Sequence, residues 1–187
     1  MKEIPALLLI DIQKAFDDHA YWGGARNNPD AEANAARLLT YWRAQGWPVI
    51  HVQHNSVLPT SIIRPGQVGN EFKEEVRPLA GEPVFGKTVN SAFIGTGLQA
   101  YLTEHQIHSL VIVGLTTDHC VSTTTRMAGN YSFDTYLVAD ATATFDKIGF
   151  DGQRYPAEQV HQLALASLHG EFATVLTTDQ LLERVAS

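Results

Sequence analysis

Continuous, almost wholly apolar runs alternate along this chain with segments whose apolar residues recur at the spacing of a helix. This alternation restricts the possible folds more than any other feature of the sequence. The runs ALLLI and SLVIVGL contain almost no polar residue, as expected of strands buried on both faces. Parallel strands need helical crossovers, so the pattern predicts an α/β fold: a doubly wound, mostly parallel six-stranded sheet with helices on both faces, a Rossmann-like three-layer sandwich. The expected strands are 6–11, 48–54, 83–87, 109–115, 133–141 and 172–178, and the expected helices are 28–46, 95–106, 119–131, 156–170 and 179–187.

The composition limits the classes of protein and partner to be considered. With 187 residues, of which 44% are hydrophobic, the chain suits one globular domain over residues 1–187. Its net charge of −7 argues against nucleic acid, which calls for a basic surface. The single cysteine excludes an internal disulfide, and no signal peptide or membrane-spanning run is recognisable. We therefore expect a cytoplasmic protein with no membrane partner.

The residues at the ends of the expected strands carry the chemistry. In parallel sheets, ligands bind beyond the carboxyl ends of the strands, near the point where strand order reverses. Asp11 ends the first strand, Lys87 ends the third, and Cys120 follows the fourth. Each alone is commonplace, because an aspartate often forms a turn, a lysine is usually at the surface and a lone cysteine is usually a small buried hydrophobe. Their convergence at one edge of the sheet indicates a site.

A thiol acts as a nucleophile through its thiolate, and three features of the sequence act on that ionisation. Cys120 falls in the first turn of its helix, where unpaired N–H groups and the macrodipole favour an anion. Lys87 supplies positive charge, and Asp11 can accept the thiol proton and return it to a leaving group. We therefore expect the pKa of Cys120 to be lowered and the helix N–H groups to receive a developing oxyanion.

Three sequence blocks, LLLIDIQKAF, GKTVNSAF and VIVGLTTDHCVSTTTRMA, resemble the isochorismatase-like cysteine hydrolases. The resemblance continues through YLVADATAT and LASLHGEFATVLTT, so it covers nearly the whole chain. It implies the isochorismatase-like fold and a catalytic triad of Asp11, Lys87 and Cys120. It also implies a cis peptide between Leu115 and Thr116, which would turn the N–H of Thr116, with that of Cys120, toward the substrate oxygen as an oxyanion hole.

The cysteine also bears on which branch of the family the chain resembles. Members with the cysteine cleave C–N bonds, whereas isochorismate hydrolases cleave a vinyl ether, and several of them lack it. Cys120 therefore favours a cysteine-dependent hydrolase of a small amide, urea or carbamate that acts through a thioester-type intermediate, without a cofactor. Two alternatives stay open: an isochorismate-type ether hydrolase, and a non-catalytic binding protein on the same fold.

The region after the second strand bears on metal binding. Nicotinamidases are similar but hold a metal there with an aspartate and histidines, and the segment HVQHNSVLPTS contains no Asp-x-His. His51 and His54 are three residues apart on a strand, so their side chains point to opposite faces. We therefore expect no metal. The candidate substrate contacts, for which ordinary core packing is the alternative, are Phe16, Trp22, His54, Asn90, Phe93 and His119.

Two further expectations concern specificity and assembly. The long segments 55–81 and 142–155 are expected to determine the substrate, because loops of this length in a compact domain are usually functional. A homodimer or homotetramer is expected, since members of the family are commonly oligomeric. Bulky aromatic residues would suit its interface or, alternatively, pack the core; they are Trp22, Tyr41, Trp42 and Trp47.

Overall fold

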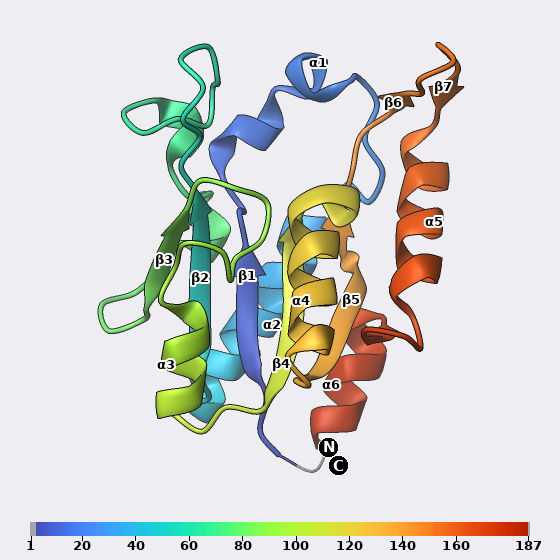
Figure 1. Cartoon of the computed structure of the whole chain (residues 1–187). Helices are drawn as coiled ribbons and strands as arrows, with labels where there is room; N and C mark the ends of the chain where they lie inside the picture. The colour runs from blue at the N-terminus through green and yellow to red at the C-terminus, as the bar shows by residue number, and fades with distance from the viewer. Residues whose placement is uncertain (1–2, 187) are drawn as a thin grey trace.

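The computed structural model describes residues 3–186 and contains a six-stranded parallel sheet (Figure 1). The strands lie in the order β3-β2-β1-β4-β5-β8, and every neighbouring pair is parallel. The predicted doubly wound six-stranded sheet is therefore confirmed. The strands are β1 (Ala6–Ile10), β2 (Val49–His54), β3 (Val84–Lys87), β4 (Ser109–Leu115), β5 (Asp134–Ala143) and β8 (Thr174–Leu176).

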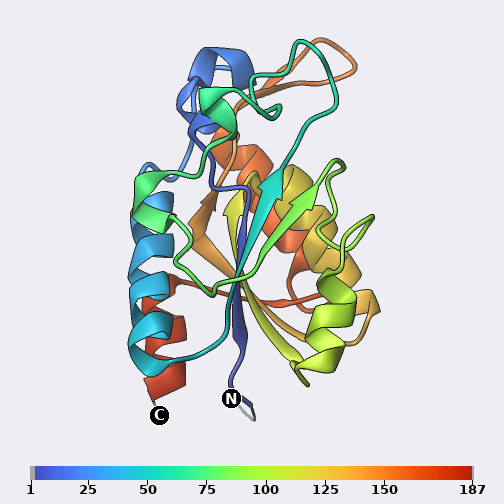
Figure 2. The same ribbon diagram turned by 90° about the vertical axis from the view of Figure 1, so that its left-hand side faces the viewer.

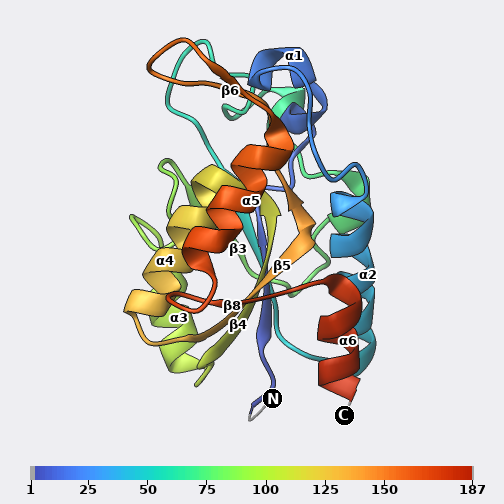
Figure 3. The same cartoon turned by 90° about the vertical axis from the view of Figure 1, so that its right-hand side faces the viewer.

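Helices cover both faces of this sheet (Figures 2 and 3). One face carries α2 (Ala31–Gln45) and α6 (Thr178–Ala186), and the other carries α3 (Leu98–Glu104), α4 (Ser122–Asn130) and α5 (Ala157–Leu168). The side chains of β1 alternate between the two cores, although all of them are apolar. This two-sided burial is the reason that the strand reads as a continuous apolar run.

The direction of strand order reverses between β1 and β4. From β1 the chain proceeds to β2 and β3 on one side, and it then returns to place β4 on the other side of β1. The crevice at the carboxyl ends of these two central strands is where ligands bind in sheets of this kind. Asp11 and the segment after Leu115 lie at this crevice.

The long connections contain short elements that the sequence did not predict. Most of them stand beyond the carboxyl ends of the strands, at the top of Figure 1. Strands of two residues are too short to show a period, which explains why the hairpin was missed. The elements are a 3-10 turn (Lys14–Asp17), α1 (His19–Trp22), 3-10 turns at Val68–Asn70 and Glu74–Val76, and the antiparallel hairpin of β6 (Lys147–Ile148) and β7 (Arg154–Tyr155).

All four aromatic residues considered for an interface pack against buried hydrophobic clusters, Trp22 against one and the other three against another. Trp42 is fully buried and donates its indole N–H to the Pro5 carbonyl, and its ring meets Tyr41 and Trp47 edge to face. These residues therefore give no support to an interface, and the homo-oligomer stays a prediction. Among the described helices, none has the length and apolar content needed to cross a bilayer.

Gly114 allows the two central strands to approach closely. Its φ is +129°, a conformation that L side chains rarely adopt, and a Cβ there would lie 2.0 Å from the carbonyl oxygen of Ile10. No side chain fits in that space. Because Asp11 follows Ile10 and Leu115 follows Gly114, this glycine fixes the spacing of the two strand ends at the crevice.

Gly114→Ala should therefore destabilise the protein strongly. We expect the free energy of unfolding to fall by about 2–5 kcal/mol, from overpacking and the unfavourable φ together. Urea unfolding followed by circular dichroism measures it. Gly97→Ala is the control, since Gly97 has a φ of −86° and its Cβ would meet nothing closer than 3.6 Å. Similar unfolding midpoints for the two variants would contradict the argument.

Candidate active site

The structure brings Asp11, Lys87 and Cys120 together beyond the ends of β1, β3 and β4. Lys87 Nζ lies 2.5 Å from Asp11 Oδ2 and 3.3 Å from Cys120 Sγ. All three side chains are buried. The ammonium therefore contacts both the carboxylate and the thiol, as expected from residues at the carboxyl ends of strands in one parallel sheet.

The end of β1 is held by backbone conformation and by one side-chain amide. Asp11 has a φ of +51°, a left-handed conformation that aspartate tolerates better than most residues, and its N–H bonds to the Val52 carbonyl at 3.0 Å. Gln13 donates from Nε2 to the His54 carbonyl at 3.1 Å, and its Oε1 accepts from the His54 N–H at 2.8 Å. Gln13 thus joins the ends of β1 and β2, a role that the sequence did not reveal.

Cys120 lies in a tight turn between β4 and α4. The peptide between Leu115 and Thr116 is cis, as the family resemblance implied. A π-helical turn, Thr117–Val121, follows and continues directly into α4. Thr116 and Cys120 both line the pocket described below, and their role as an oxyanion hole stays a prediction.

The electrostatics of the thiol differ from the sequence-based expectation. Burial raises the pKa of Cys120, and the Asp11 carboxylate raises it further, against the opposing charge of Lys87. The expected lowering of this pKa is therefore wrong for the free protein, because the sequence did not show how deeply the thiol is buried. Burial also raises the pKa of Asp11, in spite of Lys87. The resting thiol keeps its proton beside a carboxylate of raised basicity.

His54 contributes a neutral imidazole to this cluster. Its Nδ1 lies 2.9 Å from Lys87 Nζ, and burial together with the charge of Lys87 lowers the pKa of His54 to about 4. At neutral pH the ring is uncharged, and Nδ1 accepts a hydrogen bond from the ammonium. The ring proton is consequently on Nε2.

The same cluster bears on metal binding. One potential ligand atom from each of Asp11, His54 and Cys120 lies within 4.8 Å of the other two. Lys87 Nζ, however, lies 2.5–3.3 Å from an atom of each of these residues, so an ammonium occupies the centre where an ion would bind. The donor set thus suits the lysine better than a metal, and metal independence stays a prediction.

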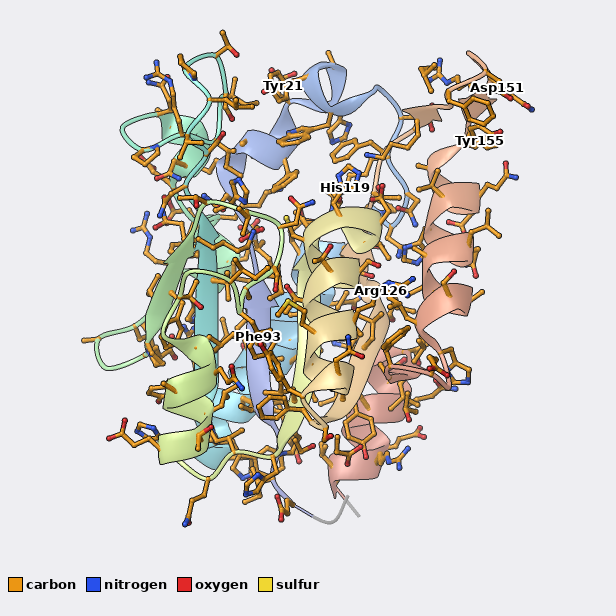
Figure 4. The ribbon with its side chains drawn as sticks, viewed as in Figure 1. Tyr21, Phe93, His119, Arg126, Asp151 and Tyr155 are labelled. Atoms are coloured by element: carbon orange, nitrogen blue, oxygen red, sulfur yellow. The ribbon has the colours of Figure 1, made fainter. Side chains whose placement is uncertain are left out.

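A cavity of about 210 Å³ opens beside Cys120 and contains most of the predicted substrate contacts. Five of the six candidates line it, and Figure 4 shows His119 below Tyr21 at this end of the molecule. Residues that the sequence did not single out complete the wall. The lining residues are Asp11, Phe16, Tyr21, Trp22, His54, Ser56, Leu58, Ser61, Ile63, Asn90, Thr116, His119 and Cys120.

Phe93 is the predicted substrate contact that does not line this pocket. Its ring packs against Tyr131 and Phe133, with centroids 5.4 and 6.0 Å away, within the core under α3 and α4. Figure 4 shows it well below His119. The chain turns between Asn90 and Phe93, so the first faces the pocket and the second takes the alternative role of core packing.

A buried hydrogen-bond network supports the Cys120 turn and was not predicted. His161 of α5 is buried, and its Nδ1 lies 2.9 Å from Oγ1 of Thr117, the first residue of the turn. Asn28, which lies 3.4 Å from the other ring nitrogen, donates to the Ala139 and Thr142 carbonyls of β5. The network thus joins the turn to α5 and β5. A lone histidine within an amphipathic helix gives no signal of such a role.

The sheet and the site together define an isochorismatase-like α/β protein. The sequence model of the isochorismatase domain matches residues 5–180, and the chain belongs to the isochorismatase family. YrdC of Bacillus subtilis, an isochorismatase family protein, is 51% identical over 97% of this chain and 96% of its own. The crystal structure of an isochorismatase-family protein from Chromobacterium violaceum has a TM-score of 0.94 and 48% identity, covering 97% of this chain and 93% of that one.

Several relatives carry the names of C–N hydrolases. A streptothricin hydrolase of Streptomyces noursei is 33% identical over 76% of this chain, which corresponds to 51% of its own length. More distant relatives are named nicotinamidase and N-carbamoylsarcosine amidase. Members of this family are thus hydrolases that include amidohydrolases.

The coupling between the three central residues predicts opposite effects of two substitutions on thiol reactivity. Asp11→Asn removes a charge that raises the pKa of Cys120, so alkylation by iodoacetamide at pH 8 should become faster. Lys87→Met removes a charge that lowers this pKa, so alkylation should become slower. Each unit of pKa changes the thiolate fraction about tenfold when the pKa lies above the pH. Superimposable rate–pH profiles for the wild type and both variants would show that the charges are uncoupled from the thiol.

The network under the turn predicts a second pair of outcomes. Thr117→Val keeps the shape but removes the hydroxyl that contacts His161, leaving a buried nitrogen unpaired at a cost of about 1–3 kcal/mol. We expect slower labelling of Cys120 by a pocket-sized electrophile and a lower midpoint of thermal unfolding. Thr117→Ser keeps the hydroxyl and should stay close to wild type in both measurements. Equal behaviour of the two variants would argue against a role for this hydrogen bond.

Proposed function

We propose that this protein is a cysteine-dependent hydrolase that cleaves a C–N bond of a small amide, urea or carbamate. The observation that carries the proposal is the buried contact of Lys87 Nζ with both Asp11 Oδ2 and Cys120 Sγ beside a substrate-sized cavity. The names of the relatives, which include amidases and a streptothricin hydrolase, support the same reaction type.

The first half of the proposed reaction forms an acyl-enzyme. Cys120 Sγ attacks the carbonyl carbon of the substrate while Asp11 takes the thiol proton, which its raised pKa favours. The N–H groups of Thr116 and Cys120 receive the oxyanion of the tetrahedral intermediate. The C–N bond then breaks, Asp11 returns the proton to the leaving nitrogen, and a thioester remains on Cys120.

The second half restores the enzyme by hydrolysis. Asp11, ionised again, takes a proton from water, and the hydroxide attacks the thioester carbonyl. Cleavage of the C–S bond releases the acid, and the thiolate recovers its proton from Asp11. Throughout the cycle the positive charge of Lys87 balances the negative charge that passes between the carboxylate and the sulfur.

This function predicts that the thiol and the carboxylate are each indispensable. Cys120→Ala should abolish turnover because no acyl-enzyme can form. Asp11→Asn should abolish measurable turnover as well, since loss of an acid/base group typically costs about 10²–10⁴-fold in rate. Both variants should keep the circular dichroism spectrum of the wild type. The assay is release of ammonia or amine over a panel of small amides, ureas, carbamates and lactams. Near-full activity of Asp11→Asn with any true substrate would exclude its role in proton transfer.

Two further measurements, mass spectrometry of the enzyme and treatment with a chelator, separate the alternative functions. Mass spectrometry of enzyme quenched during turnover should find the acyl group on Cys120. Turnover of a vinyl ether without an adduct would favour ether hydrolysis, and a Cys120 inert to amides and electrophiles alike would favour a binding protein. Loss of activity after exhaustive chelation, restored by added metal, would overturn the prediction of metal independence.

A further inference from the structure

Resting on the proposed hydrolase function, we propose that the substrate of this site is a small uncharged molecule whose non-reacting part is flat and apolar. The geometry of the pocket wall, the pairing of nearby charges and the size of the cavity support this inference separately. The aromatic wall lies outside the predicted triad, whereas the charge pairing includes Asp11 and Lys87.

One wall of the pocket is a rigid stack of aromatic rings. Phe16 and Trp22 stack with centroids 4.6 Å apart, and Phe145 supports both from behind at 6.4 and 6.3 Å. Tyr21 meets Trp22 edge to face at 5.0 Å. Such a wall buries a flat apolar group well, since aromatic rings prefer stacked or edge-to-face contacts.

The indole N–H of Trp22 in this wall is already used inside the protein. The indole Nε1–H of Trp22 donates to the Ala15 carbonyl at 2.8 Å, which also fixes the ring. Trp22 therefore presents ring surface rather than a hydrogen-bond donor to the cavity, and the Tyr21 hydroxyl is the polar group that this wall retains. Leu58 and Ile63 add aliphatic surface to the lining.

The charges at the pocket floor balance one another. Asp11 and Lys87 form an ion pair at 2.5 Å, and His54 is neutral at pH 7 because its pKa is about 4. Burial also lowers the pKa of His119 at the rim of the pocket, although the negative charge of Asp118 acts to raise it. A charged substrate would therefore enter without a fixed counter-charge, and an unpaired charge in a desolvated cavity is costly.

Two cationic side chains beyond the pocket wall, Lys73 and Lys147, are likewise paired. Lys73 Nζ lies 2.6 Å from both Asp17 and Glu32, and Lys147 Nζ lies 3.4 Å from Asp118. Recruiting either to a substrate carboxylate would break an existing ion pair. The neutral hydrogen-bonding groups of the lining, which include Ser56 and Ser61, suit an uncharged amide instead.

The volume sets the size of the ligand. About 210 Å³ is below the roughly 300–1,000 Å³ of pockets that hold drug-sized molecules. The cavity therefore suits a ligand smaller than a drug-sized molecule.

Electrophiles that label Cys120 test this inference without knowledge of the natural substrate. The probes are iodoacetamide, iodoacetate and N-phenyl iodoacetamide, which are neutral, anionic, and neutral with a flat ring. Each labelling rate is divided by the rate of the same probe with the urea-unfolded chain, in which Cys120 is still the only thiol. This normalisation removes the intrinsic reactivity of each probe.

We expect iodoacetamide to exceed iodoacetate by at least about tenfold in normalised rate, because the anion finds no free counter-charge. N-phenyl iodoacetamide should exceed iodoacetamide, and Trp22→Ala should remove this advantage while Trp22→Phe keeps it. Leu58→Arg adds a cation at the mouth of the pocket and should lower the ratio of the iodoacetamide rate to the iodoacetate rate severalfold. Leu58→Met is its matched control and should leave the preference unchanged.

The outcomes separate this inference from the proposed function. Iodoacetate that labels as fast as iodoacetamide would overturn the uncharged substrate, and no advantage for the phenyl probe would overturn the flat apolar group. Either result is compatible with amide hydrolysis. If instead the labelling pattern holds but no amide, urea or carbamate forms an acyl-enzyme, the pocket description stands and the hydrolase function fails.

Discussion

The buried ammonium of Lys87 is the interaction on which the site depends. Removing a charged group from water costs several kcal/mol, and its partners must compensate for that loss. Lys87 Nζ contacts Asp11, Cys120 and His54, and it donates to the Val89 carbonyl at 3.1 Å. One cation thus fixes the mutual positions of a carboxylate, a thiol and an imidazole, and their protonation states are coupled through it.

Three features outside this cluster hold the backbone that carries it. Gln13 joins the ends of β1 and β2, Gly114 sets the approach of β1 to β4, and the Thr117–His161 contact anchors the turn of Cys120. Each acts on a different segment, so the geometry of the cluster is defined from several directions at once. Such preorganisation favours catalysis because the reacting groups do not have to be assembled for each turnover.

Much of this arrangement could be predicted from the sequence, because it follows from periodicity and topology. Apolar runs located all six strands of the sheet, and the carboxyl-end rule located Asp11, Lys87 and Cys120. The direction of the thiol pKa could not be predicted, since burial is its largest cause and the depth of burial belongs to the folded chain. Phe93 was misplaced because a local loop conformation decides which of two nearby residues faces the pocket. The role of His161 depends on a contact between segments 44 positions apart.

The strand order also determines when the site can form during folding. Asp11 and Cys120 lie on opposite sides of a chain reversal, and Lys87 reaches them across β2 from the edge of the sheet. These contacts are distant in sequence, and closing such long loops is slow. The ammonium therefore meets its partners only after β3, β2, β1 and β4 are aligned. A nascent chain that has not yet released β4 from the ribosome cannot contain this cluster, so the contacts of Cys120 form only as the central sheet is completed.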